Sequence, residues 1–296
     1  MWEPTYVPRD RIEAAREGRG FAASASGLCL CGELTGLALA CVAIVGTRAA
    51  TPYGRRLAHR FGADLGRSGC CIVSGLALGI DAAAHEGALE AGAPTIGVLG
   101  GGHHRFFPRP NRGLAERMIA GRGAVLSPYP PEHDAFPPQF LQRNGIVAAL
   151  ADAVVVIEAP ARSGALNTAG WAAGHIPVLA VPGDVDRKHV QGCLALIRDG
   201  ATLARDAGDV LEALGRLNLV PTPPATPKSD DPVSNALLGA LDSGALELDQ
   251  LVAMSGVGPA AVLAALSLME LDGTIEAQGA TRYARVGAPS RGEELP

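Results

Sequence analysis

Residues 42–85 read VAIVGTRAATPYGRRLAHRFGADLGRSGCCIVSGLALGIDAAAH, and this stretch decides the fold. Its two apolar runs, VAIVG and CCIVSG, are short enough for strands buried on both faces, and each precedes a helix-compatible pattern. Similar runs recur near residues 95–99, 124–126, 153–157 and 178–181. This alternation predicts an α/β fold with a doubly wound parallel sheet, in which ligands bind outside the carboxyl ends of the strands.

Small and polar residues follow the first two predicted strands. Gly46, Thr47 and Arg48 follow the first, and Ser74 and Gly75 follow the second. A helix N-terminus after such a turn leaves backbone amides unpaired, and an arginine adds a bidentate phosphate donor. Either glycine alone is equally well explained as a strand terminator. Together with Arg48 they favour an anion site.

The formal net charge of -5 does not by itself suggest a protein that binds a polyanion. Its distribution is uneven, because residues 232–286 hold six acids and two arginines, whereas residues 1–231 hold 22 residues of each sign. A basic groove is compatible with the balanced part of the chain. Composition alone does not demonstrate one.

Sequence motifs for catalysis and for cofactor binding are missing. The first turn reads GTRAATPYG rather than GxGxxG, and the second strand ends in Ser74 rather than an acid, which argues against a nicotinamide site. Walker A, HExxH and nucleophile-elbow patterns are absent. The six cysteines form no CxxC pair and no Cys/His ligand spacing. We therefore expect no catalytic residue, no cofactor and no metal site.

Asp81 and His85 lie four residues apart on the helix predicted after Gly79, so their side chains share one face. We expect a structural hydrogen bond between them that fixes the turn. A ligand or catalytic role for this pair is the alternative. His103 and His104 receive no function.

Residues 27–46 are apolar enough to need testing as a membrane segment. Glu33, Gly32 and Gly36 interrupt them, and their last residues fit a strand better. The preceding residues do not resemble a signal peptide. With cysteines that read as reduced core residues, this predicts a cytoplasmic protein with no membrane contact.

Several further blocks follow in a fixed order: TIGVLGGG (95–102), FPRPN (107–111), FPPQFLQRN (136–144), VVVIEAPARSGALNTA (154–169), VPG (181–183) and GCLALIRDGA (192–201). Over roughly residues 42–201 the chain resembles the DNA-processing protein A (DprA/Smf) family. The resemblance implies an extended Rossmann-like sheet that binds single-stranded DNA. It also implies protection of incoming DNA, loading of the RecA recombinase in natural transformation, a homodimer, and no known catalytic reaction.

On this basis the strand ends are expected to form one groove that tracks a single-stranded backbone. Arg48 would hold a phosphate, Arg109 and Arg143 would flank the path, and Phe107 or Phe136 would stack a base, with core packing as the alternative for at least one of them. The turns at 74–75 and 163–164 would offer backbone amides. The expected DNA-binding residues are Gly46, Thr47, Arg48, Ser74, Gly75, Arg109, Asn111, Arg143, Asn144, Ser163 and Gly164.

Three residues depart from the family pattern. Gly145 replaces the usual second arginine after Arg-Asn, Leu194 replaces a common asparagine, and Val190 stands near an expected serine. These changes predict either weaker DNA binding or a repurposed groove.

The domain organisation follows from the same patterns. We expect a short, truncated or degenerate segment at 1–40, the Rossmann-like domain at 41–219, a Pro-rich linker at 220–232, a winged-helix-like domain at 233–287 and a flexible tail at 288–296. The third helix of the winged-helix-like domain, 258–272, has no Lys or Arg, which favours a protein contact or a structural role over duplex reading. Arg282 and Arg285 keep the duplex alternative open.

Two other functions fit the sequence less well. The LOG phosphoribohydrolases use a related nucleotide-binding sheet, but they need a PGGxGTxxE loop, and residues 160–168 read PARSGALNT without that Glu. A recombination adaptor with little DNA affinity is the second alternative. The acidic C-terminal part and the neutral sheet domain support it.

Overall fold

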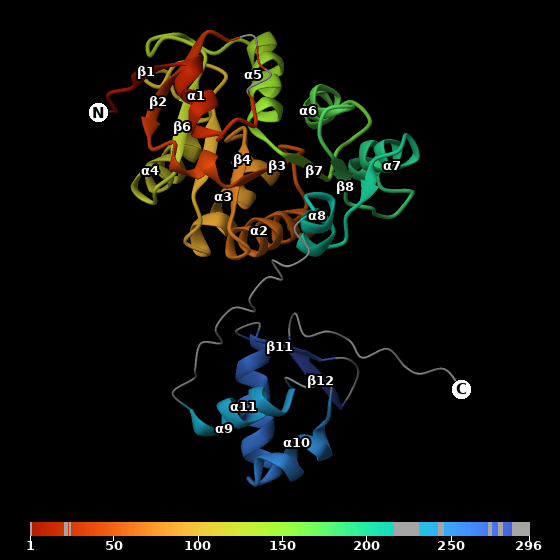
Figure 1. Ribbon diagram of the computed structural model, residues 1–296. Helices are drawn as coiled ribbons and strands as arrows, with labels where there is room; N and C mark the ends of the chain where they lie inside the picture. The colour runs from red at the N-terminus through yellow and green to blue at the C-terminus, as the bar shows by residue number, and fades with distance from the viewer. Residues whose placement is uncertain are drawn as a thin grey trace. The chain divides into compact units, whose positions relative to one another are not determined.

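The computed structural model describes residues 2–20, 23, 25–215, 231–241, 246–271, 274–277 and 281–285. They belong to two units, Met1–Thr222 and Pro223–Pro296, each of which is considered by itself (Figure 1). Most of the predicted linker at 220–232 and the whole predicted tail at 288–296 lie outside the described residues.

The first unit is built on a nine-stranded sheet in the order β1-β2-β6-β5-β4-β3-β7-β8-β9. Neighbours from β6 to β9 along this order are parallel, whereas β1 pairs with β2 and β2 with β6 in antiparallel fashion. The predicted doubly wound sheet is therefore confirmed. The strands are β1 (Thr5–Pro8), β2 (Gly27–Gly32), β3 (Ala40–Gly46), β4 (Cys70–Ser74), β5 (Thr95–Val98), β6 (Ala124–Ser127), β7 (Ala153–Ile157), β8 (Val178–Ala180) and β9 (Thr202–Leu203).

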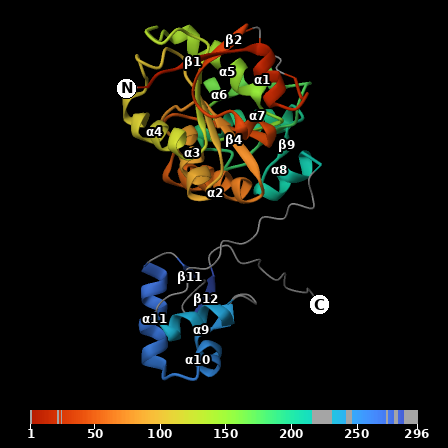
Figure 2. The same cartoon turned by 60° about the vertical axis from the view of Figure 1, so that its left-hand side comes forward.

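Helices cover both faces of the sheet (Figures 1 and 2). The α-helices are α1 (Arg9–Ala15), α2 (Pro52–Arg67), α3 (Ile80–Glu90), α4 (Arg112–Ala120), α5 (Pro137–Leu150), α6 (Gly164–Ala172), α7 (Gln191–Arg198) and α8 (Ala207–Ala213). The 3-10 helices are η1 (Thr35–Ala38), η2 (Arg109–Asn111) and η3 (Lys188–Val190).

Alternate residues of β3 supply two separate cores. Cys41, Ala43 and Val45 pack in the core that α5 and α6 cover, whereas Val42 and Ile44 pack in the core that α2, α3 and α8 cover. A strand buried on both faces reads as a continuous apolar run, as VAIVG does. The cysteines of β3 and β4 are buried core residues that form no disulfide with the residues that the structure describes, as expected.

The sheet extends beyond the boundary expected at residue 41, because β1 and β2 add two antiparallel strands at its edge. Leu28 on β2 and Ile12 on α1 are buried in the main core. Arg16, just after α1, is buried and pairs with Asp152 at 3.1 Å. Glycines at both ends of β2 and the shortness of β1 weaken the period-two signal that would have predicted these strands.

The second unit joins three helices to a three-stranded antiparallel sheet of order β10-β12-β11. Its elements are α9 (Pro232–Leu241), β10 (Leu246–Glu247), α10 (Leu248–Ser255), α11 (Pro259–Leu271), β11 (Ile275–Ala277) and β12 (Arg282–Arg285). Leu237, Leu251 and Leu266 from the three helices share one core. This arrangement confirms the predicted winged-helix module, although parts of the predicted wing at 274–286 lie outside the described residues.

Among the described residues, no single helix is long and apolar enough to cross a membrane. In the same part of the chain, α10 and α11 taken together pass that test of length and composition, across a bend of 112°.

Candidate nucleic-acid interface

The carboxyl ends of β3 and β7 form the point where the sheet reverses its direction of growth. Strands β4, β5 and β6 follow on one side of β3, whereas β7, β8 and β9 follow on the other. Doubly wound sheets bind ligands at such a switch point. The predicted groove therefore lies where this architecture places a binding site.

The turn after β4 uses its polar groups internally. The Gly75 amide donates to Asp81 Oδ2 at 3.1 Å, and the Ser74 hydroxyl donates to the Ile44 carbonyl at 2.6 Å. Burial raises the pKa of Asp81, and the charge of Arg143 opposes that rise. We expected Ser74 and Gly75 to offer free donors to a phosphate, but the Asp81 carboxylate already occupies the Gly75 amide.

Arg143 is buried beneath the strand-end turns, although it also lines the pocket at the carboxyl ends of β3 and β7. The residue is 4% exposed, and its guanidinium donates through Nη1 to the carbonyls of Gly75 and Val98. Burial lowers its pKa to about 10, an effect that the Asp81 charge partly offsets. The side chain points from α5 under the strand ends, so the expected flanking position is corrected to one beneath the turn.

Asn111 also supports this turn. It is buried, and its Nδ2 donates to the carbonyls of Leu76 at 2.8 Å and Ala77 at 3.0 Å. Leu76 has a φ of 53°, a conformation that side-chain-bearing residues seldom adopt. The amide of Asn111 is therefore occupied in holding a strained turn, and not directed at the groove as we had expected.

His85 does not pair with Asp81, so that prediction was wrong. His85 Nδ1 lies 2.7 Å from Thr95 Oγ1, which itself donates to the Ile72 carbonyl at 2.8 Å. The ring nitrogen is therefore the donor to Thr95. Full burial, together with the Arg143 charge, lowers the pKa of His85 to about 3. The i,i+4 spacing failed as a guide because Asp81 turns toward the amides at 75 and 77 instead.

The turn after β3 presents Arg48 to solvent. The Thr47 amide donates to the Glu158 carbonyl at 2.7 Å, which ties this turn to the end of β7. A Cβ at Gly46 would overlap the Ile157 carbonyl, so a glycine permits this close approach. Arg48 is exposed, and its guanidinium lies 5.1 Å from the centre of the Phe140 ring.

The N-terminus of α6 faces the same turn. Ser163 caps the helix, accepting a hydrogen bond from the Ala165 amide at 3.3 Å. Asn144 donates to the Gly164 carbonyl at 3.0 Å, so it fastens α5 to α6. A pocket of about 310 Å³ lies here, and we call it the switch-point pocket. Its lining includes Arg48 and Arg162 together with residues 46–47 and 163–165.

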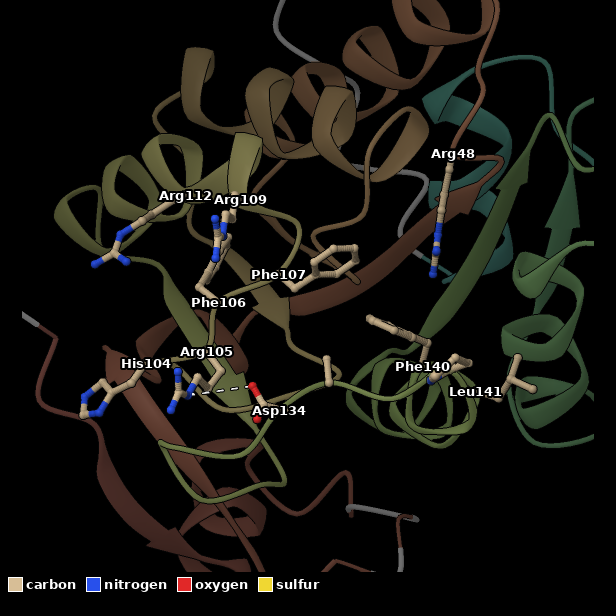
Figure 3. Close-up of a pocket in the computed structure, with 12 residues that line it drawn as sticks. Arg48, His104, Arg105, Phe106, Phe107, Arg109, Arg112, Asp134, Phe140 and Leu141 are labelled. Carbon is tan, nitrogen blue, oxygen red and sulfur yellow. Dashed lines mark ion pairs between the residues drawn. The ribbon is translucent and has the colours of Figure 1, made fainter.

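A larger cavity of about 1050 Å³ adjoins Arg48, and we call it the basic cleft (Figure 3). It brings together Arg48, Arg109 and Phe107, three residues that the sequence had singled out. Phe107 is 51% exposed, and its ring centre lies 5.8 Å from that of Phe140. The full lining is Arg48, His104, Arg105, Phe106, Phe107, Arg109, Arg112, Asp134, Ala135, Pro137, Phe140 and Leu141.

Two arginines of the basic cleft have acidic partners. Arg105 lies 3.7 Å from Glu132 and 3.8 Å from Asp134, and the second of these pairs is drawn in Figure 3. Arg112 pairs with Glu116 at 3.2 Å. These contacts partly neutralise both guanidinium groups.

Three other arginines remain available. Arg48 and Arg109 in the basic cleft and Arg162 in the switch-point pocket form no ion pair with any residue that the structure describes. All three are exposed. They are the natural partners for an anionic ligand.

His104 lies at one end of the basic cleft. Its Nδ1 lies 2.6 Å from Glu132 Oε1, and its Nε2 lies 2.9 Å from the Trp2 carbonyl. The hydrogen bond to Glu132 is the main cause that raises the pKa of His104. The Trp2 ring also contacts Arg112, whose guanidinium lies 5.4 Å from the ring centre.

Sequence reasoning missed Arg105, Arg112, Phe140 and Arg162 as lining residues. The block GHHRFFPRPNR, at 102–112, gave a usable signal because basic and aromatic residues alternate in it. Nothing in the sequence indicated that this block meets residues 134–141. Phe136, the alternative to Phe107, is exposed but does not line the basic cleft.

Within the described part of the chain, no group of three or more His, Cys, Asp or Glu side chains is placed to hold a metal ion. Glu158 lies directly after β7 and before the loop in which a LOG-type Glu would stand at position 168. Its carboxylate is buried and accepts hydrogen bonds from the amide and the hydroxyl of Thr51. These contacts fix the start of α2.

Comparisons with known proteins agree with the fold. The family model of DNA recombination-mediator protein A matches residues 19–215, and that of the DprA winged helix domain matches residues 221–280. A putative DNA processing protein DprA of Mycobacterium tuberculosis is 40% identical over 257 residues, which cover 83% of this chain and 65% of that protein. The DNA processing protein DprA of Bacillus subtilis is 38% identical over 184 residues, 62% of each chain.

Two solved structures are similar as well. DNA processing protein A from Streptococcus pneumoniae has a TM-score of 0.60 at 38% identity and covers 64% of this chain and 66% of its own. DNA processing protein A from Helicobacter pylori, described with its single-stranded DNA binding mode, has a TM-score of 0.62 at 26% identity, over 73% of this chain and 97% of its own. The chain spans 65% of the length of the Mycobacterium relative. From the match over residues 19–215, we conclude that the chain belongs to the DNA recombination-mediator protein A family.

Proposed function

We propose that this chain binds single-stranded DNA along the basic cleft and the switch-point pocket, as a DNA-processing protein that protects incoming DNA. The observation that carries the proposal is the basic cleft itself, where the unpaired cations of Arg48 and Arg109 accompany the exposed ring of Phe107. Its volume, about 1050 Å³, is at the upper end of the range for small-molecule sites. A polymer segment suits it better than a single small metabolite.

The aromatic rings favour a single strand over a duplex. Proteins hold single strands by combining a cationic groove with aromatic faces on which unpaired bases stack. Phe107 is half exposed and packs against Phe140, so its ring is held in place while a face remains available. A paired base has no free face to offer except at a duplex end.

The phosphates have a second set of partners beside the cleft. Arg48 lines both the basic cleft and the switch-point pocket, where Arg162 and the first turn of α6 add positive potential. A backbone that crosses from one pocket to the other passes Arg48. This arginine therefore has the largest expected effect on affinity.

Loading of the RecA recombinase in natural transformation, a homodimer and a cytoplasmic location belong to this proposal. Trp171 on α6 is 57% exposed, which supports a protein contact on that face. A Cβ at position 145 would lie 3.2 Å from the Trp171 ring, so Gly145 suits the packing of Trp171 over α5. We attribute the departure at Gly145 to this packing, and propose that the departures at Val190 and Leu194 leave the basic cleft intact, since neither residue lines it.

We also propose that the chain acts by binding and not by catalysis. A hydrolase related to the LOG proteins would need a Glu in the loop that follows β7, and Thr168 stands at that position. Glu158, which precedes the loop, is 4% exposed, and Thr51 holds its carboxylate. The contacts of Glu158 therefore support a structural role.

The test is fluorescence anisotropy of a labelled single-stranded oligonucleotide over a salt series, with a duplex of the same sequence as control. Arg48→Ala should flatten the salt slope by about 0.7 in log K per log salt, which is about fourfold in affinity at 0.15 M salt. Arg11→Ala is the matched variant, because Arg11 is exposed on α1 and does not line the basic cleft or the switch-point pocket. Binding that is equally tight in both variants, or absent at low salt, would rule out the proposed interface and favour an adaptor role.

A further inference from the structure

A second basic surface begins at Arg48 and continues along α2. A shallow cavity of about 540 Å³ lies there, and we call it the α2 surface. It is lined by Arg48, Arg55, Arg56, His59, Leu78, Gly79, Ala82, Ala83, Glu86 and Asn111. Apart from Arg48 and Asn111, these residues come from α2, α3 and the turn between β4 and α3. The α2 surface is therefore built from elements other than the loops and α5 residues that form most of the basic cleft.

The α2 surface carries excess positive charge. Arg55 and Arg56 are exposed and form no ion pair with the residues that the structure describes. His59, one turn further on the same side of the helix, pairs with Glu90 at 3.1 Å. Glu86 is the acid in the lining, and it pairs with Arg117 at 3.5 Å. Two unbalanced guanidinium groups therefore face solvent next to Arg48.

The α2 surface is continuous with the basic cleft. Arg48 lines both. Leu78, which is 41% exposed, lines the α2 surface and also a small cavity that it shares with Phe107 and Phe140. A strand that leaves the cleft at Arg48 thus passes Leu78 and reaches Arg55 and Arg56.

We infer that the α2 surface is an exit subsite that holds the phosphodiester backbone of the same DNA strand beyond the nucleotides bound in the basic cleft. The inference rests on the proposed function. Its lining has guanidinium groups but no Phe, Tyr or Trp ring, so it holds phosphates and leaves the bases unstacked. Binding there depends on strand length and not on base identity.

The test compares oligonucleotides of about 6 to about 20 nucleotides, a range that overlaps the site sizes of single-strand binding modules and extends beyond them. The double variant Arg55→Ala/Arg56→Ala should bind the shortest strands as wild type does. It should lose about 14-fold in affinity for the longest at 0.15 M salt, with a salt slope flatter by about 1.4. Arg11→Ala/Arg198→Ala removes two exposed arginines that line none of the three cavities, one of which, Arg198, pairs with Asp199 at 3.5 Å. This control should change neither the affinity nor the salt slope.

A variant that is expected to bind more tightly controls for loss of folding, because a misfolded protein would not gain affinity. Glu86→Gln removes the acid of the α2 surface and frees Arg117, so it should tighten binding of long strands and leave short strands unchanged. A long strand with uncharged methylphosphonate linkages at one end provides an independent check. If the neutral end of this strand occupies the α2 surface, the double variant should bind it with the same affinity as the wild type does.

The outcomes separate this inference from the proposed function. If Arg48→Ala leaves binding of short strands unchanged, the proposed function fails, and the exit subsite fails with it. If Arg48→Ala weakens short strands while the double variant has no length-dependent effect, only the exit subsite is overturned. The exit subsite would also be overturned if the double variant lost affinity equally at every strand length. The same holds if its affinity fell only when a second free strand was added.

Discussion

Substituting the buried Arg143 with Met should separate stability from DNA binding. The change removes the guanidinium beneath the turn after β4 and keeps a side chain of similar length. The carbonyls of Gly75 and Val98 then lose the Nη1 donor that they share. Asp81, which is buried with its pKa already raised by desolvation, loses the nearby positive charge that opposes the rise.

The expected magnitude follows from these contacts. A buried acceptor left without its donor costs about 1–3 kcal/mol, and the loss of the positive charge near Asp81 adds to this cost. Relief of the burial that lowers the pKa of Arg143 to about 10 offsets part of this loss. We expect the free energy of unfolding to fall by about 3 kcal/mol, which corresponds to roughly 6–12 °C in Tm for a unit of this size.

Urea denaturation measures the loss, and the m-value should not change because the surface exposed on unfolding stays the same. Under conditions where the variant is folded, its salt slope for single-stranded DNA should equal that of the wild type. Arg48→Ala should show the reverse pattern, with normal stability and a flatter slope, since Arg48 is exposed. An Arg143→Met protein with wild-type stability and a slope flatter by about 0.7 would refute the structural role and place Arg143 on the DNA.

Three further changes test other parts of the site. His85→Gln should remove a pH dependence of the free energy of unfolding. The pKa of His85 is about 3 in the folded protein and 6.5 in the unfolded chain, so the unfolded state binds more protons between these two values. As the pH falls from neutral to 5, His85 should therefore lower wild-type stability by about 2 kcal/mol. If the urea midpoint of the variant depended on pH as that of the wild type does, the assignment would be contradicted. Gly54→Ala should destabilise the fold by about 1–3 kcal/mol, because a Cβ there collides with the Glu158 carboxylate. In urea denaturation, Gly54→Ala/Glu158→Ala should lose less stability than the sum of the two single changes. In anisotropy titrations, Phe107→Ala should weaken single-strand binding by about 1–3 kcal/mol with no change of salt slope. Phe136→Ala removes an exposed ring outside the basic cleft, and a comparable loss in this variant would argue against stacking on Phe107.

The parallel part of the sheet was predictable because each central strand is apolar on both faces. The runs at 42–45, 71–73 and 153–157 are buried along their whole length, and the structure places them side by side. A two-sided core requires such runs, so a short run of this kind between helical patterns indicates a central strand. The antiparallel strands β1 and β2 on one side of the sheet impose no comparable requirement and left no clear pattern.

The location of the site was predictable from the sequence, but the contacts of its residues were less so. Strand-end turns mark the binding edge of a doubly wound sheet, which located Gly46, Arg48 and Ser163 near one another. A sequence does not say whether an amide at such a turn faces a ligand or an acid of its own chain. At Gly75 the acid is Asp81, six residues later, and a buried arginine lies beneath it.

Two of the acids near this edge of the sheet explain how a unit of balanced composition can present a basic surface. Asp81 and Glu158 follow the ends of β4 and β7, and both carboxylates point inward to backbone amides, Asp81 to Gly75 and Glu158 to Thr51. Carboxylates held in this way contribute little negative potential to the surface above them, since backbone dipoles and, at Asp81, a buried arginine oppose their charge. Arg48 stands at the same edge, exposed and without an acidic partner among the described residues. The arrangement of charge at the strand ends, and not the net charge of the chain, therefore determines whether this edge attracts a nucleic-acid backbone.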